Sequence, residues 1–92
     1  MTGDEHSFRE LDEVRGLPKG SAFRAFKRVA GQLEEGHHFR VLEAHRDHGE
    51  IEALRQAGRI YDASVNVVLL GPGAAARVAA ELDGRQKPGS EP

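Results

Sequence analysis

The stretch that decides the fold spans residues 21–33 and reads SAFRAFKRVAGQL. Apolar side chains recur in it at helical spacing, so we expect one face of this helix to point inward. Arg24, Lys27 and Arg28 fall on the opposite face, and the stretch contains no Asp or Glu. Ser21 is the predicted N-cap. The predicted inward residues are Ala22, Phe23, Phe26, Val29, Ala30 and Leu33.

A shorter helix is predicted immediately before this stretch. Ser7–Glu10 has the residue types of a capping box, in which the Ser hydroxyl accepts from a backbone amide and the Glu reaches back. This helix is expected to end near Gly16, and the Leu-Pro-Lys-Gly sequence of residues 17–20 predicts a turn because Pro and Gly interrupt helices. The sequence therefore predicts a helix–turn–helix over residues 7–33. The inward residues of the first helix are predicted to be Phe8, Leu11 and Val14.

Beyond the helix–turn–helix, the chain alternates strand and helix signals. Residues 38–43 predict a short strand, and Val65–Leu70 is the strongest strand signal because it is β-branched and apolar. A short helix is predicted between them from Asp47 to Gly58, and a last helix over Gly73–Leu82. Two strands alone are marginally stable, so the helices must pack on them. The predicted class is α+β: a helix–turn–helix followed by a two-stranded antiparallel element with an inserted short helix and a C-terminal helix.

The length and composition predict one small domain. The chain has 92 residues and no cysteine, which excludes disulfides and thiolate metal sites. The domain is expected over residues 7–82, with disordered polar segments at 1–6 and 83–92. The longest unbroken apolar run, Val67–Leu70, is far short of the roughly 20 residues that span a bilayer. We therefore expect a cytoplasmic protein with no membrane partner.

Charge is divided unevenly along the chain. Residues 14–33 carry five basic residues and no acidic ones, whereas the remainder holds eight bases and fifteen acids, a net charge of −7. A local excess of this kind favours an anionic partner, although an ordinary solvated helix face would look the same. The five basic residues are Arg15, Lys19, Arg24, Lys27 and Arg28.

Duplex DNA is the partner that this pattern predicts. Phosphate contacts supply most of the affinity of proteins for DNA, and Lys or Arg at helical spacing can straddle a groove. Residues near the start of such a helix approach base edges, where Arg is the commonest reader of guanine. The residues expected there are Lys19, Ser21, Ala22, Arg24 and Ala25. The predicted nucleic-acid-binding set is Arg15, Lys19, Ser21, Arg24, Lys27 and Arg28.

The order of elements resembles the winged helix–turn–helix regulators of bacteria and phages. It is similar in outline to the C-terminal DNA-binding domain of phage antirepressors and to excisionase-type modules. The segments that carry the resemblance are Leu11–Leu17 as supporting helix, Ser21–Val29 as recognition-type helix, Gly36–Leu42 as the following strand, and Val67–Gly73 running into a helix. The connection from Leu42 to Val65 is longer than a plain hairpin wing. The resemblance implies a small bacterial or phage regulator that binds duplex DNA.

Two alternatives concern protein partners. The same basic face could act on an acidic protein, which would make the chain an adaptor or an inhibitor of the anti-activator type. The narrow stripe of Ala75, Val78 and Leu82 on the last helix could form a homodimer or complete the core of one chain, and the sequence leaves both open.

Neither a metal site nor catalysis is predicted. The histidines match no strong zinc spacing, so surface loop positions are expected for them. There is no Cys nucleophile and no G-x-S-x-G elbow, and the pair Asp12–Glu13 is expected to be solvated. In Gly71–Gly73, Pro72 removes an amide that a phosphate cradle would need. We therefore expect no enzyme and no cofactor. The histidines considered are His37, His38, His45 and His48.

Overall fold

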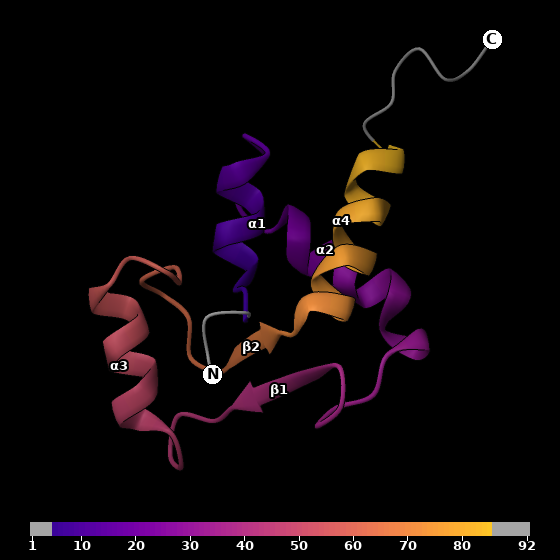
Figure 1. The fold of residues 1–92 in the computed structure, drawn as a ribbon. Coiled ribbons are helices and arrows are strands. Elements are labelled where there is room, and N and C mark those ends of the chain that lie inside the picture. The colour runs from indigo at the N-terminus through magenta and orange to yellow at the C-terminus, as the bar shows by residue number, and fades with distance from the viewer. Residues whose placement is uncertain (1–4, 86–92) are drawn as a thin grey trace, which may run out of the picture.

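The structure, a computed structural model, describes residues 5–85 of the chain (Figure 1). Over these residues it is an α+β domain with four α-helices and a two-stranded antiparallel sheet, as predicted. None of these helices combines the length and apolar character needed to cross a bilayer. In chain order the elements are α1 (Phe8–Val14), α2 (Ser21–Val29), the 3₁₀ turn η2 (Ala30–Gln32), β1 (Phe39–Leu42), α3 (His48–Gln56), β2 (Val67–Leu70) and α4 (Pro72–Arg85).

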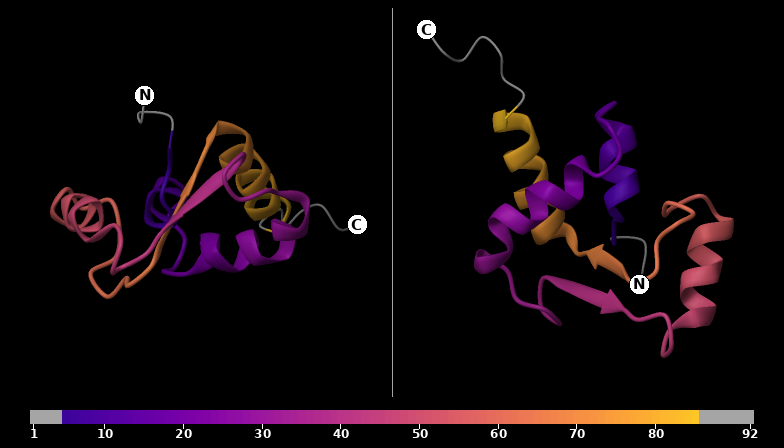
Figure 2. Two further views of the ribbon diagram at one scale, coloured as in Figure 1. Left: turned by 90° about the horizontal axis from the view of Figure 1, so that it is seen from below. Right: turned by 180° about the vertical axis from the view of Figure 1, so that it is seen from behind.

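The sheet lies between α1, α2 and α4 on one face and α3 on the other. β1 pairs with β2 in a register that sets Phe39 opposite Leu70 and Leu42 opposite Val67, which confirms the predicted antiparallel pairing. Successive side chains of a strand point to opposite faces. Leu70 packs with the residues of α1, α2 and α4, whereas Leu69 packs with those of α3. Because both faces of β2 are covered, its sequence is a continuous apolar run (Figures 1 and 2).

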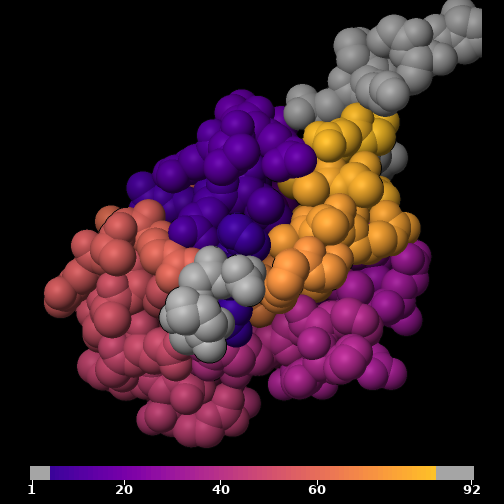
Figure 3. Space-filling model, in the orientation of Figure 1, coloured from indigo at the N-terminus to yellow at the C-terminus, as the bar shows by residue number. Residues whose placement is uncertain are grey.

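The larger core forms where α2 crosses between α1 and α4 (Figure 2). Small residues on α2 let its neighbours approach closely, and the inward face of α4 meets them. The stripe of Ala75, Val78 and Leu82 is buried here, so it completes the core of this chain. The buried members of the cluster are Leu11, Ala22, Ala25, Phe26, Val29, Leu70, Ala74, Ala75, Val78 and Leu82. In the space-filling view, α1 is flanked by the α3 side of the molecule and by α4 (Figure 3).

Two apolar residues predicted to be inward lie on the surface. Val14 is 78% exposed and Phe23 is 47% exposed. The stripe that α2 buries consists of Ala22, Ala25, Phe26 and Val29, at i, i+3, i+4 and i+7. Phe23 falls beside this stripe, where α1 covers only part of its ring. Val14 is the last residue of α1, whose buried residues are Leu11 and Asp12.

Several predicted boundaries also differ from the structure. Ser21 is the first helical residue of α2 and not its N-cap; Gly20 takes that place with φ of 93°. The last helix continues past Leu82 to Arg85, into the segment expected to be disordered. His6, predicted to belong to a disordered terminus, forms two backbone hydrogen bonds with Leu70 beside the sheet. Glu5, from the same predicted segment, forms an ion pair with Arg40. The remaining residues of the predicted disorder, 1–4 and 86–92, lie outside the described residues.

The predicted capping box at the start of α1 is confirmed. The Ser7 hydroxyl accepts from the Glu10 amide at 3.2 Å, and the Glu10 carboxylate accepts from the Ser7 amide at 2.8 Å. The same residues join α1 to the segment after α3, because the Ser7 hydroxyl donates to the carbonyl of Arg59 and the Arg59 guanidinium donates to Glu10 at 2.7 Å. A local cap thus also fixes a contact between residues 49 positions apart.

This junction predicts a loss of stability in acid. Burial pushes the pKa of Glu10 upward, but the hydrogen bonds from Arg59 and the Ser7 amide outweigh it and hold the pKa below its ordinary value of 4.5. The ionised carboxylate of Glu10 therefore stabilises the folded state at any pH above its ordinary pKa. This stabilisation is lost as the pH falls through the lower pKa that Glu10 has in the folded state. We expect the unfolding free energy, measured by urea denaturation, to decrease as the pH is lowered from about 4.5. In the Glu10→Gln variant this decrease should be less steep. Equal slopes in both proteins would contradict this role.

Candidate nucleic-acid interface

The outward face of α2 carries the predicted cations. Arg24, Lys27 and Arg28 are all exposed, and Lys19 is exposed in the turn that precedes the helix. The opposite face of α2 is fixed by packing against α1 and α4, so these side chains are directed away from the core. The structure therefore brings together on one side of α1 and α2 most of the residues predicted to bind nucleic acid.

The start of α2 depends on Asp12, a residue that the sequence placed in solvent. Asp12 is fully buried, and its carboxylate accepts from the backbone amides of Gly20 at 3.0 Å and Ala22 at 2.7 Å. It also accepts from the Tyr61 hydroxyl at 2.5 Å. The first amides of a helix have no partner within the helix, and α2 has no acid in its first turn. Asp12 supplies the missing acceptor from α1.

Tyr61 belongs to the same arrangement. Burial, together with the hydrogen bond to Asp12, raises the pKa of Tyr61 to about 12. The phenol therefore stays protonated at neutral pH and donates to the carboxylate. Arg9 and Lys19 lie over its ring, with the guanidinium carbon 5.6 Å and the ammonium nitrogen 5.1 Å from the ring centroid. The segment after α3 thus holds α1 and the start of α2 in a fixed relation.

Two of the predicted cations are engaged by acids of α4. Arg28 forms an ion pair with Glu81 at 2.6 Å, and Arg15 forms one with Asp83 at 3.0 Å. These acids lie 53 and 68 positions from their partners, so the acid-free sequence of α2 does not produce an acid-free surface. Both pairs are partly exposed to solvent, and exposed ion pairs contribute little to stability. Their effect is to offset positive charge at the ends of α1 and α2.

Three cations, on α2 and in the turn before it, form no ion pair with a described carboxylate. Within residues 5–85, no carboxylate forms an ion pair with Lys19, Arg24 or Lys27. Lys27 lies over the ring of Phe23, with its nitrogen 5.4 Å from the ring centroid. A cation over an aromatic face remains solvated and able to contact an anion. We call these three residues the basic triplet.

Core packing buries two of the residues that were predicted to approach base edges. Ala22 and Ala25 are each 0% exposed, so neither can touch a ligand. The Ser21 hydroxyl donates to the carbonyl of Pro18 at 2.8 Å, which fixes the turn. Of that predicted group, Lys19 and Arg24 remain as long, exposed side chains.

Other arginines do not extend the basic triplet. Arg40 is held by Glu5 and Glu50 at 2.6 and 2.7 Å, and Arg59 by Glu10. Arg55 pairs with Glu52 and also donates to the carbonyl oxygens of Asp62 and Ser64. All three secure the α3 side of the molecule. None of these three arginines therefore adds an unpaired positive charge to those of the basic triplet.

The histidines are dispersed through loops and one helix start. The His37 and His38 rings lie in contact, with centroids 4.6 Å apart, and the His38 ring nitrogen Nδ1 accepts from the Glu34 amide. His45 and His48 are exposed on either side of the start of α3. In the described part of the chain, no three His, Asp or Glu side chains come together as a metal-binding group.

Comparison with protein-family models, with curated proteins and with solved structures found no match to the chain. Function is therefore inferred from the charges and contacts of the domain itself.

Proposed function

We propose that this domain is the winged-helix-like DNA-binding module of a small bacterial or phage regulator. The observation that carries the proposal is the basic triplet of Lys19, Arg24 and Lys27, which lies exposed along the second helix of a helix–turn–helix and in the turn before it. In this proposal α2 lies in the major groove and α1 supports it, while Lys19, Arg24 and Lys27 contact phosphates.

The arrangement behind α2 supports this docking. The helix is held by Asp12 at its start and by α4 along its inner face, so its orientation does not depend on the ligand. The connection between β1 and β2, which holds α3, would occupy the place of a wing. Arg28 and Arg15 already have carboxylate partners, so we assign three phosphate-type contacts to one domain. Binding by one copy is then expected to be weak and mostly insensitive to sequence.

A salt titration of binding to a mixed-sequence duplex tests the proposal. Each neutralised phosphate lowers the slope of log K against log salt by about 0.9, so three contacts predict a slope of about −2.7. Fluorescence anisotropy with a labelled duplex at several salt concentrations gives this slope. A slope near zero, or the absence of binding at low salt, would refute the assignment.

An acidic protein surface is a second candidate partner. The observation that favours it is the ring of Phe23, which is 47% exposed beside the ammonium group of Lys27. An isolated cationic patch next to exposed apolar surface is typical of protein interfaces. The same titration separates the two, because a domain that binds only an acidic protein leaves the duplex free at every salt concentration.

A further inference from the structure

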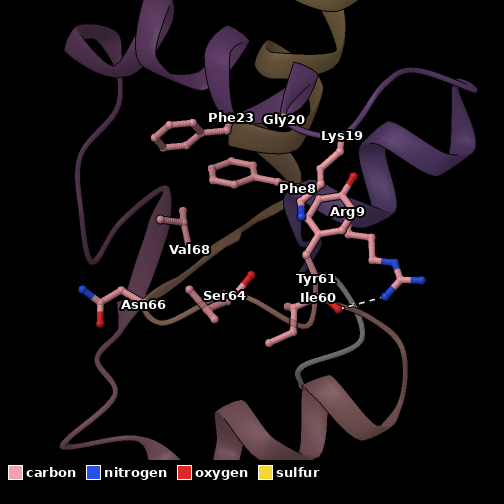
Figure 4. A pocket seen from close by; sticks show the side chains of 11 residues that line it. Phe8, Arg9, Lys19, Gly20, Phe23, Ile60, Tyr61, Ser64, Asn66 and Val68 are labelled. Atoms are coloured by element: carbon pink, nitrogen blue, oxygen red, sulfur yellow. Dashed lines mark hydrogen bonds between the residues drawn. The ribbon is translucent and has the colours of Figure 1, made fainter.

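A cavity of about 340 Å³ opens between α1, the start of α2 and the segment from Ile60 to Val68 (Figure 4). This volume lies at the lower end of the range that small-molecule sites occupy. The cavity touches no carboxylate side chain, and most of its wall is apolar. It is lined in particular by Phe8, Phe23, Ile60, Val68, Tyr61 and Lys19.

The lining is divided by polarity. At one end the rings of Phe8 and Phe23 meet edge to face, with centroids 5.7 Å apart, and Val68 lies across from them (Figure 4). At the other end the cations of Lys19 and Arg9 lie beside the ring of Tyr61. The apolar end accounts for the exposed ring of Phe23, because a ligand in the cavity would remove that ring from water.

Lys19 is the cation of the cavity that a ligand can pair with. Arg9 is committed to Glu13 at 2.7 Å and to the carbonyl of Ile60 at 3.0 Å. Asp12 lies behind Tyr61, but its carboxylate is satisfied by three donors and is fully buried. Lys19 has no ion-pair partner among residues 5–85. An occupant that satisfies both ends has an apolar body and one negative group.

We infer that this cavity binds a small carboxylate with an aromatic or branched apolar body. The body lies against Phe8, Phe23 and Val68, and the carboxylate accepts from the Lys19 ammonium group. The cavity shares Lys19 with the basic triplet, but its occupation is tested with probes that contain no nucleic acid, so the outcome is distinguishable from that of the DNA-binding proposal. A ligand there contacts Gly20 and Tyr61, which are both hydrogen-bonded to Asp12.

Phenylacetate and phenylacetamide form a matched pair of probes, because they share a body and differ in charge. Titration of each into the full chain, followed by amide chemical shifts in two-dimensional NMR, should give saturable changes at Gly20, Phe23 and Val68. The exposed residues Ala53 and Gln56 of α3 serve as an internal control. We expect phenylacetate to bind roughly fivefold more tightly than the amide, because it adds one partly exposed ion pair.

Two variants separate the charge from the cavity. Lys19→Gln should remove the preference for phenylacetate and leave phenylacetamide binding unchanged, whereas Arg46→Gln, which removes an exposed cation in the loop before α3, should preserve the preference. Val68→Phe should fill the cavity and abolish binding of both probes while circular dichroism remains that of the wild type. Saturable binding with this dependence on Lys19 supports the inference. Failure of both probes to saturate, equal affinities in the wild type, or shifts spread evenly over α3 would overturn it.

Discussion

Replacement of Asp12 by Ala is expected to destabilise the domain by about 3 kcal/mol, because a buried donor left without an acceptor costs about 1–3 kcal/mol. The substitution removes the acceptor of three donors at once: the amides of Gly20 and Ala22 and the hydroxyl of Tyr61. Only the amide of Ala22 is fully buried, so water can replace part of the loss at the other two. For a domain of this size, the midpoint of thermal unfolding should fall by roughly 12–24 °C.

Two variants give this prediction its controls. Glu13→Ala removes the neighbouring acid, which is exposed and paired with Arg9 one helical turn away, and should cost less than about 0.5 kcal/mol. Tyr61→Phe removes one of the three donors and leaves the carboxylate bound to both amides, so we expect a loss of about 1 kcal/mol. Calorimetry or urea denaturation of the three variants gives the order. An Asp12→Ala variant no less stable than Glu13→Ala would refute the capping role.

Local signals were sufficient where the interacting residues are close in sequence. The capping box of Ser7 and Glu10 lies within one turn, so its residue types alone predict its geometry. The helical spacing of residues 21–29 and the apolar run of Val67–Leu70 predict α2 and β2 for the same reason. Pairing between the two strands was expected because they are the only ones predicted, but their sequence does not fix the antiparallel direction, which the structure shows.

The burial of Asp12 could not be predicted without knowing the tertiary contacts of α1, although the sequence contains one signal that points to it. Asp12 follows Leu11 and lies four residues after Phe8, so helical spacing places it on the inward face of α1. Its polarity argues for solvent unless a partner is available. The partner is the start of α2, a helix with no acid of its own in the first turn. A helix rich in bases and lacking an acidic cap implies an acceptor elsewhere in the chain.

The charge of the candidate interface was predictable only in part. The outward direction of Arg24 and Lys27 follows from the periodicity of α2. The acids that engage Arg28 and Arg15 come from α4, and their approach depends on how that helix packs across α2. The exposure of Phe23 is similar, because it is set by how much of α2 the neighbouring helices can cover.

Reversal of two charges in the basic triplet should reduce DNA affinity by about 100-fold at physiological salt, because two counterion-releasing contacts are lost and two like charges are introduced. The variant is Arg24→Glu with Lys27→Glu. Both side chains are exposed and neither has a carboxylate partner within residues 5–85, so the fold should be preserved. The salt slope should become shallower, from about −2.7 to about −0.9, since one contact remains.

Arg46→Glu is the matched control for this reversal. Arg46 is also exposed, but it lies in the loop before α3 and is already paired with Asp47 at 2.9 Å. The control changes the net charge by −2, half the −4 of the double variant, so a general effect of charge would appear in both proteins, at half the size in the control on a logarithmic scale. We expect the control to change affinity less than threefold. A loss of about tenfold in the control would show that binding follows overall charge and not α2, whereas a loss confined to the double variant would support DNA binding by this helix.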